Sequence, residues 1–330
     1  MMAGERQWIR YFRLMVAKDN RNEVAIDLSE FRVRFHITQA ATGQPCTAKI
    51  RIYNVSDQVV NSIETPTSES VKHGHSTVII DAGYQEHHSV IFQGDLWWKT
   101  TGRDSETDDY LELIATAGDR AHQHSIVNTS LPAGSTQADI FRVVARSMEE
   151  MGVGVCKKPD LMTTALPRGK VLYGMSRDFM QGLADTNQFL WGYATEGLAT
   201  IPAQGEDKAA KVVVLNAASG LLDRPSIGVD GLKCRALLNP DLEFGKVVQI
   251  DTKTIQTPGF STAANANSVN ENLAATGAYL DPDGFYKIVS RVHSGDTRGD
   301  EWFTDLICTG VGSAAPVLDQ GILNFTPNQK

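Results

Sequence analysis

The segment that most constrains the fold is a predicted β-hairpin in the last third of the sequence. Tyr286, Ile288 and Val292 alternate with basic residues, which is the period-two pattern of a strand with one buried face. Residues 294–300 then bring two glycines and two aspartates, which favour turn geometry, before 301–308 return as a second strand. The C-terminal third is therefore expected to contain a long antiparallel hairpin.

The first third of the sequence shows the same alternation. Phe31, Val33, Phe35 and Ile37 are separated by single polar residues, so their strand is expected to have one solvated face. A turn at 43–45 brings the chain back to a partner strand. Strands are predicted over 8–17, 24–28, 31–37, 48–52, 76–82, 89–98 and 110–117, with a short helix over 58–63.

The pattern becomes helical in the middle of the sequence. Ser135 or Thr136 is expected to cap a helix over 137–151, and Ser176 a second helix over 176–187. After these helices the alternation returns. Further strands are predicted over 189–195, 198–201, 211–215, 232–237 and 247–250.

Together these elements predict an α+β protein that is mainly β, with a helix-containing module between two β regions. The expected domains are 1–120, 121–207 and 208–330. Within the last of them, 258–280 has too little apolar content to pack and is expected to be a mobile loop, and 310–330 an extended tail.

Composition excludes several classes of protein. The 31 basic and 39 acidic residues give a net charge of -8, which argues against broad capture of a nucleic acid backbone. No stretch approaches the roughly 18 apolar residues of a membrane span, so a soluble product without an export signal is expected. Four distant cysteines favour buried thiols in a reducing compartment over zinc ligands or disulfides. These are Cys46, Cys156, Cys234 and Cys308.

No phosphate loop, nucleotide fingerprint or nucleophile elbow is present, so no catalytic residue, cofactor or metal is predicted. Two His-x-His pairs would each put two imidazoles on one strand face, but no third ligand follows, so solvated histidines are expected. One acidic run lacks the fixed glycine of a calcium loop, so a solvated turn is expected. The pairs are His73/His75 and His122/His124, and the acidic run is Asp104, Glu106, Asp108 and Asp109.

Tryptophans raise the possibility of a sugar-binding surface. Trp97 and Trp98 are adjacent in a predicted strand, so one ring is expected to face the core and the other solvent or a partner. Asp300 and Glu301 beside Trp302 suggest glycoside cleavage, which needs two carboxyl groups flanking one bond. Adjacent strand residues point to opposite faces, so a charged turn followed by a packed tryptophan is expected instead.

Four stretches resemble one known family. Residues 49–56 resemble its strand leading to an Asn-containing turn, and 90–96 its following strand. Residues 231–248 resemble the start of its second tube-like domain, and 286–305 the closing strands of that domain. The family is the baseplate hub proteins of contractile-tailed phages, the tail hub or late control D-like family, which is related to the base of type VI secretion spike proteins.

This resemblance implies a fold with two related tube-type β-barrel or sandwich domains. It also implies a non-enzymatic virion protein of the tail baseplate, assembled in the host cytoplasm. Three copies would form a ring that joins the hexameric tail tube to the trimeric spike, contacts other baseplate proteins and lets DNA pass without specific binding. No membrane insertion by this chain is implied.

Such a protein acts through interfaces rather than reacting groups. The alternatives are a tube-terminating or adaptor ring elsewhere in the tail, and a glycan-binding or glycan-cleaving β protein. The interface candidates are Trp97, Trp98, Asp296, Arg298, Trp302 and Phe325.

Overall fold

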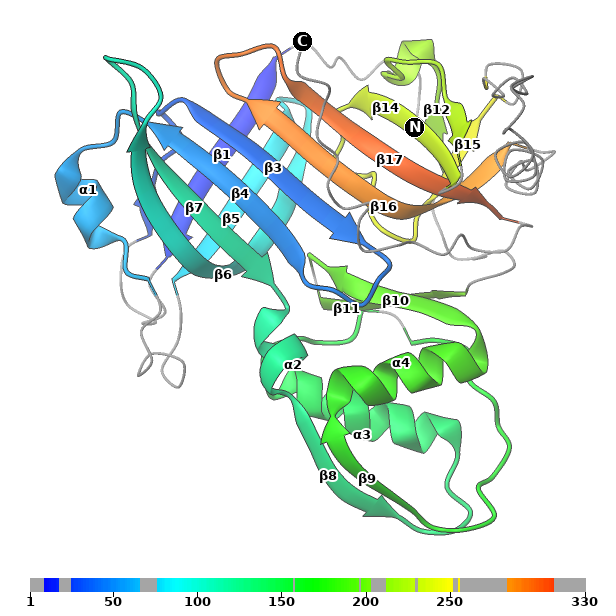
Figure 1. Cartoon of the computed structure of the whole chain (residues 1–330). Coiled ribbons are helices and arrows are strands. Elements are labelled where there is room, and N and C mark those ends of the chain that lie inside the picture. Colours follow the sequence, from blue (N-terminus) through cyan, green and yellow to red (C-terminus); the bar gives the residue numbers. More distant parts are fainter. Residues whose placement is uncertain are drawn as a thin grey trace, which may run out of the picture.

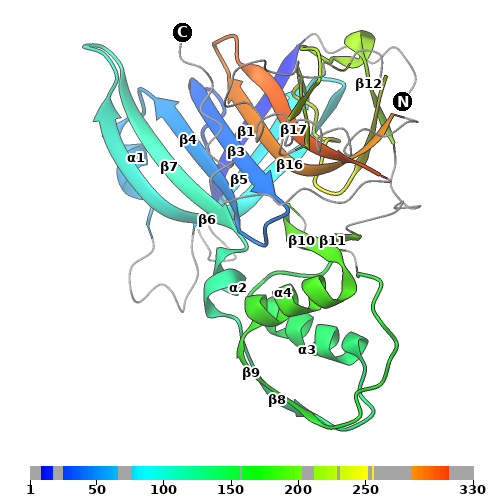
Figure 2. The same cartoon turned by 45° about the vertical axis from the view of Figure 1, so that its right-hand side comes forward.

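The computed structural model describes residues 9–17, 25–65, 76–156, 158–195, 197–202, 212–228, 231–251, 255 and 284–311. The strands of the two β regions form one large twisted sheet, with a helical module on one side of it (Figures 1 and 2). The predicted mainly β, α+β fold is confirmed. None of the helices in the described part of the chain has the length and apolar character that a membrane crossing needs.

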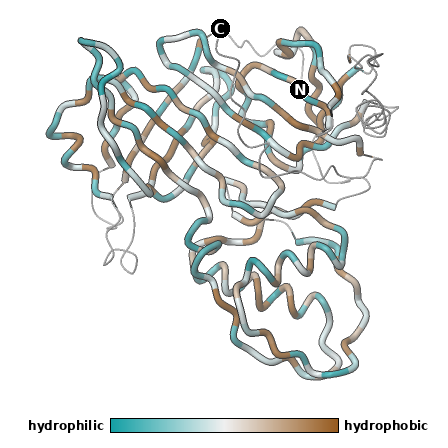
Figure 3. The backbone as a smooth tube through the Cα atoms, in the orientation of Figure 1, coloured by the Kyte–Doolittle hydropathy of each residue, from teal (hydrophilic) through white to brown (hydrophobic). Residues whose placement is uncertain are grey.

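The first β region contributes seven strands and one short helix. Polar and apolar residues alternate along its strands, seen as alternating colours in Figure 3, so that one face is buried in a core. Each predicted strand is present, and β6 extends further than predicted. The elements are β1 (Arg10–Ala17), β2 (Ile26–Asp27), β3 (Val33–Ala40), β4 (Cys46–Tyr53), α1 (Asp57–Ser62), β5 (Thr77–Tyr84), β6 (His87–Arg103) and β7 (Asp109–Ala117).

The described part of the last β region contributes six strands. The predicted hairpin is confirmed, and its first strand continues through the glycine-containing segment as far as Asp296. One strand, β13, was not predicted, because three residues are too few to show an alternation. The elements are β12 (Val213–Leu215), the 3-10 helix η2 (Ala217–Ser219), β13 (Ser226–Gly228), β14 (Gly231–Leu237), β15 (Val247–Ile250), β16 (Phe285–Asp296) and β17 (Trp302–Gly310).

The strand β16 joins the two β regions into one sheet. One edge of β16 pairs with β17 throughout, whereas the other pairs with β15 over 285–287 and with β3 over 290–296. A β-bulge lies between Ile288 and Ser290, where the partner changes, and bulges bend a strand in this way. The sheet order is β13-β14-β17-β16-β3-β4-β7-β6-β5-β1-β2, with β12 and β15 attached beside β16.

The two β regions share the arrangement of five strands and differ beyond them, because β1 pairs antiparallel with β5 whereas β12 pairs parallel with β15. In the first region β6 and β7 form a hairpin, β7 pairs with β4, and β4 pairs with β3, all antiparallel. In the last region β16 and β17 form the hairpin, β17 pairs with β14, and β14 with β13, again antiparallel. β5 and β15 each pair with the first part of the long hairpin strand. The likeness that the family resemblance implies is therefore present in the topology.

The helical module has its own core, formed where α3 and α4 pack against two short hairpins. Thr136 caps α3 through a capping box with Asp139, as one of the two predicted caps. Ser176 does not cap α4: the cap residue is Met175, and the buried Ser176 hydroxyl bonds those of Ser125 and Ser147. The elements are α2 (Asp119–His124), β8 (Ile126–Leu131), α3 (Gln137–Glu149), β9 (Lys170–Met175), α4 (Ser176–Asn187), β10 (Phe189–Ala194) and β11 (Gly197–Pro202).

The prediction that β16 has one solvated face is wrong, because both of its faces are buried. Lys287 is 1% exposed, and its Nζ donates to the Pro202 carbonyl of β11 at 2.7 Å. Arg291 is 2% exposed and donates to the carbonyls of Leu242 at 3.2 Å and Ile91 at 3.4 Å. Lys287 and Arg291 thus bond carbonyls of neighbouring segments instead of meeting solvent.

A buried histidine in β16 predicts a pH-dependent stability. The His293 ring is fully buried and bonds the Thr304 hydroxyl through Nδ1 at 2.8 Å. Burial, and then the charge of Arg291, lower the pKa of His293 well below 6.5. Below pH 6.5 the His293 imidazole is therefore protonated in the unfolded chain but stays neutral in the folded chain. This difference lowers the unfolding free energy by about 1.4 kcal/mol per pH unit. Urea unfolding at pH 7 and pH 5 is expected to show this loss of unfolding free energy. The His293→Gln variant should lose less unfolding free energy between the two pH values. An equal loss in both proteins would contradict the lowered pKa of His293.

The three-domain division stays a prediction. Separate hydrophobic clusters lie in the first β region, the helical module and the last β region, and a small fourth cluster lies between them. The predicted loop at 258–280 and nearly all of the predicted tail lie outside the described residues.

Candidate interface surfaces

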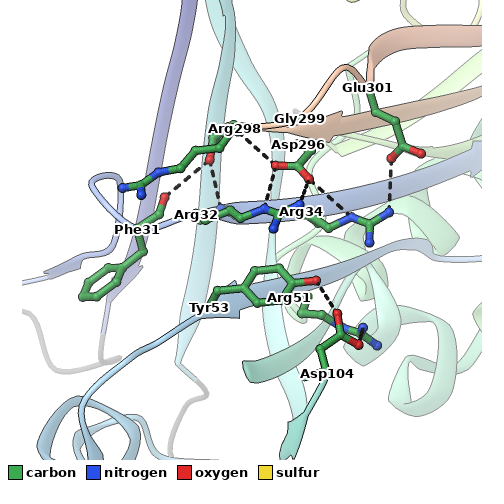
Figure 4. Close-up of polar contacts among 12 residues, drawn as sticks. Phe31, Arg32, Arg34, Arg51, Tyr53, Asp104, Asp296, Arg298, Gly299 and Glu301 are labelled. Carbon is green, nitrogen blue, oxygen red and sulfur yellow. Dashed lines mark hydrogen bonds and ion pairs between the residues drawn. The ribbon is translucent and has the colours of Figure 1, made fainter. Parts of the chain in front are cut away.

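The turn that closes the β16–β17 hairpin is held on β3 by a group of ion pairs. Asp296, at the end of β16, is 3% exposed and accepts a 2.7 Å hydrogen bond from Arg32. Arg34 lies 3.6 Å from the same carboxylate and 3.6 Å from Glu301 (Figure 4). Burial raises the pKa of Asp296, but hydrogen bonds from Arg32 and from the Arg298 amide outweigh it and leave this pKa below its ordinary value. The carboxylate is thus charged and fixes the junction between the two β regions.

Trp302 and Arg10 hold the other side of this turn. The Trp302 side chain is 2% exposed, and its indole N–H donates to the Gly83 carbonyl at 3.2 Å. Its ring meets Phe12 and Phe35 edge-on, in the core of the first β region. Arg10 lies over the indole at 5.3 Å and donates to main-chain carbonyls of the turn. Because Trp302 is packed inside the chain, its side chain does not face a partner.

The outward face of the joined sheet is polar and carries a repeated group of side chains. In the first β region, Arg51 of β4 lies directly opposite Glu112 of β7, with 2.9 Å between nitrogen and oxygen. The Arg51 guanidinium also stacks 4.0 Å above the Tyr110 ring. Lys49 approaches the other Glu112 oxygen at 3.3 Å. Both cations on this part of the face therefore have a carboxylate partner.

The last β region has the same group at the equivalent positions. Arg235 of β14 lies directly opposite Asp305 of β17, with 2.7 Å between nitrogen and oxygen, and stacks 4.2 Å above the Phe303 ring. The arginine, acid and aromatic residue thus occupy matching places in both regions. The internal likeness extends from topology to side-chain contacts.

A signal for this repeat exists in the sequence but was not used in the prediction. Residues 110–117 read Tyr-Leu-Glu-Leu-Ile-Ala-Thr-Ala, and 303–310 read Phe-Thr-Asp-Leu-Ile-Cys-Thr-Gly. The aromatic residue, the acid, the Leu-Ile pair and the threonine all coincide. Eight residues with three identities are a weak signal until the strand pairing aligns them.

A shallow pocket of about 260 Å³ lies on this polar face, where β3, β4 and the β16–β17 hairpin meet. Arg34, His36, Lys49, Arg51, Glu301 and Phe303 contribute to its lining. Burial is the main reason that the pKa of His36 lies below its ordinary value. Arg34 pairs with Glu301, and Lys49 and Arg51 pair with Glu112 outside the pocket. Because these cations already have carboxylate partners, the arrangement favours a polar contact surface over a catalytic site.

Trp97 and Trp98 are both exposed, at 56% and 57%. The prediction that one of the two rings faces the core is therefore wrong. The cause is a β-bulge between Leu96 and Trp98 in the pairing of β6 with β7, which inserts one residue and breaks the alternation of faces. Aromatic residues of this kind are enriched in protein interfaces.

The other interface candidates are placed differently. Arg298 is exposed in the β16–β17 turn, and its guanidinium donates to the Glu30 carbonyl at 3.0 Å. Phe325 lies outside the described residues. The structure thus brings Asp296, Arg298 and Trp302 together at one turn and leaves Trp97 and Trp98 on a separate edge.

The metal candidates do not form a site in the described part of the chain, where no group of three possible ligands occurs. His122 and His124 lie in the last turn of the helix α2, so the predicted strand geometry for them is wrong. His73 and His75 are outside the described residues. The acidic run forms the β6–β7 turn as predicted, where Asp104 accepts from Arg51 and Asp109 from Arg103.

The cysteine prediction holds for three of four residues. Cys46, Cys234 and Cys308 are buried thiols, and burial is the main reason that the pKa of Cys46 rises to about 12. Cys156 is exposed, contrary to the prediction, because it lies in the short segment that follows α3. None of the four is joined to another by a disulfide bond.

Sequence comparisons return nothing: no protein-family model matches, and no curated protein matches. Solved structures do resemble the chain. The 43 kDa tail protein of prophage MuSo2 from Shewanella oneidensis has a TM-score of 0.55 at 8% identity, over 93% of this chain and 100% of that protein. A tail protein from Neisseria meningitidis has a TM-score of 0.51 at 11% identity, over 92% and 98%.

A third similar structure comes from E. coli and is described as a type VI secretion component with similarity to the T4 tail proteins gp27 and gp5. Its TM-score is 0.51 at 11% identity, over 92% of this chain and 79% of that protein. At such low sequence identity, the structural similarity shows the fold alone. The chain has the fold of phage tail proteins and of the type VI secretion spike base, as the sequence resemblance implied.

Proposed function

We propose that this chain is a structural baseplate hub protein, which forms a trimeric ring between a hexameric tail tube and a trimeric spike. The observation that carries the proposal is the repeated β region within one chain. Three chains would present six equivalent modules, so one ring could meet a sixfold tube on one side and a threefold spike on the other. A tube-terminating or adaptor ring of six single modules would not need this duplication.

The polar face of the sheet supports a role in lining a DNA channel. Its arginines are paired with carboxylates, as in Arg51–Glu112 and Arg235–Asp305. DNA phosphates bind free cations strongly, so a wall whose cations are already neutralised would let DNA slide. The opposite face is the apolar core side and is covered by the chain itself. We therefore assign the polar face to the lumen.

The function rests on interfaces, and no residue is assigned a catalytic role. The partners we propose are two further copies of this chain, the tail tube protein, the spike protein and other baseplate proteins, in the virion tail. The resemblance to tail proteins and to a spike component supports these partners.

Native mass spectrometry tests the copy number. The purified protein, alone and with the tube and spike proteins of the same particle, is expected to give a species of three times the 36.0 kDa chain mass. Six copies would favour the adaptor ring instead. A monomer in every mixture would contradict both, and binding of that monomer on a glycan array would favour the sugar-binding alternative.

A further inference from the structure

Part of β6 has an edge that no strand of the described residues pairs with. β5 pairs with β6 only from His87 to Asp95, and the last main-chain bond on that side joins the Leu96 amide to Ser76. From there to Arg103, β6 pairs only with β7 among the described residues. Open edges of this kind carry free main-chain donors and acceptors and readily accept another strand.

A second open edge lies at the far end of the sheet. β13, over Ser226–Gly228, is a terminal strand in the sheet order, and among the described residues it pairs only with β14. Among the described residues, β2 and β12 also pair with a single neighbour each, so the edges of β6 and β13 are not the only open ones. The open part of β6 and the strand β13 belong to opposite ends of the repeated arrangement.

The internal junction shows what the open part of β6 is built to hold. β16 is the counterpart of β6, and the bulge at Val289 is the counterpart of the bulge at Trp97. Beyond its bulge β16 is not open: residues 290–296 pair antiparallel with β3, the counterpart of β13. If β6 were paired as β16 is, its open part would pair with β13. The β13 of the same chain cannot fill this place, because it lies at the other end of the sheet.

Exposure of the two tryptophans agrees with a missing neighbour. Their counterparts, Val289 and Ser290, are 0% and 6% exposed because the adjoining segments cover them. Trp97 and Trp98 are 56% and 57% exposed. The same positions are thus covered where the next β region is present and bare where it is absent.

A basic residue after each bulge extends the equivalence. Lys99 donates to the carbonyls of Val60 and Ile63, which follow β4. Its counterpart Arg291 donates to the carbonyl of Leu242, which follows β14. Both strands are therefore anchored in the same way at the second residue after the bulge.

We propose that the edge of β6 from Trp98 to Arg103 pairs antiparallel with β13 of a second copy of this chain. This rests on the proposed ring, since the same junction repeated head to tail closes into a cycle. The internal junction also sets the register, because Val292 opposes Thr38 and His293 opposes Ile37. When this register is applied to the equivalent positions of β6 and β13, Thr100 opposes Gly228 of the neighbouring copy, and Thr101 opposes Ile227 of that copy.

Disulfide trapping tests the register. In the internal junction the amides of Ala41 and Thr297 donate to the carbonyls of Val289 and Val33, so Val292 and Thr38 between them form a non-hydrogen-bonded pair. Such a pair has Cα atoms about 4.5 Å apart, within the range a disulfide spans. A Cβ on Gly228 meets nothing closer than 3.7 Å, and Thr100 is exposed. The test protein therefore carries Thr100→Cys and Gly228→Cys, with the exposed thiol removed by Cys156→Ser.

Mild oxidation of this variant is expected to give covalent multimers up to the trimer on a non-reducing gel. The matched control carries Thr101→Cys with Gly228→Cys, and a one-residue slip turns the two side chains to opposite faces, so cross-linking should fall at least about tenfold. A trimer by native mass spectrometry without the specific cross-link would overturn this pairing and leave the ring intact. Absence of any multimer would overturn the ring as well.

A double substitution gives a second measurement that does not depend on cysteines. Trp97→Ser with Trp98→Ser should leave the melting of the isolated chain nearly unchanged, since both rings are exposed there. Loss of buried aromatic anchors from an interface should raise the dissociation constant of the multimer by about tenfold or more. An unchanged dissociation constant would show that this edge is not the interface.

Discussion

Trp302→Ala is expected to lower the unfolding free energy by about 3–5 kcal/mol, the range found when large aromatic residues are removed from a core. The indole is 2% exposed and packs against Phe12 and Phe35. Although Trp302 belongs to the last β region, its ring lies in the core of the first. The substitution should therefore weaken both regions in a single transition, as measured by urea unfolding.

Trp302→Phe separates packing from hydrogen bonding. It keeps most of the apolar volume but removes the indole N–H that donates to Gly83, so about 1–3 kcal/mol of the loss should remain. An unfolding curve for Trp302→Ala that matches the unsubstituted protein would show that the ring is not part of the core.

Asp296→Ala is expected to lower the unfolding free energy by about 2–3 kcal/mol, since the carboxylate bonds one guanidinium and one main-chain amide in a nearly buried position. The loss should appear at neutral pH, where the carboxylate is charged. Glu301→Ala is the matched control: its carboxylate is 45% exposed and 3.6 Å from Arg34, so it should cost under about 1 kcal/mol. Equal losses from both substitutions would contradict a special role for Asp296 at the junction.

Asp296 also predicts acid sensitivity. Its folded-state pKa lies below the ordinary value, so its contribution is complete above the unfolded pKa of about 3.9 and is lost as pH falls through the lower folded pKa. Asp296→Ala should therefore show less acid destabilisation below about pH 4 than the unsubstituted protein. A larger loss of unfolding free energy in the variant below about pH 4 would contradict the lowered pKa of Asp296.

Most of the fold prediction rests on the alternation of apolar and polar residues along the strands. The strands of the first β region and the β16–β17 hairpin were found because one face of each is apolar at every second residue. Ser135 and Thr136 are candidates for the N-cap of α3 because Ser and Thr are favoured at that position. Thr136 is the N-cap in the structure. These are short-range patterns, which depend little on what packs around them.

The errors come from contacts between segments far apart in sequence. The alternation predicts solvated positions for Arg291 and His293, because the sequence does not show that other segments cover that side of β16. Trp97 and Trp98 were assigned to opposite faces, because a bulge is invisible in a period-two count. The Arg–acid–aromatic repeat was missed because Arg51 and Glu112 meet only after the strands pair.

Cryo-electron microscopy of the tail particle that contains this chain tests the central claim most directly. The account predicts three copies around the tail axis, six equivalent β modules in one ring, and Arg51–Glu112 and Arg235–Asp305 facing the lumen. A ring in which the two β regions are not related by about one sixth of a turn, or in which this polar face points away from the lumen, would contradict it.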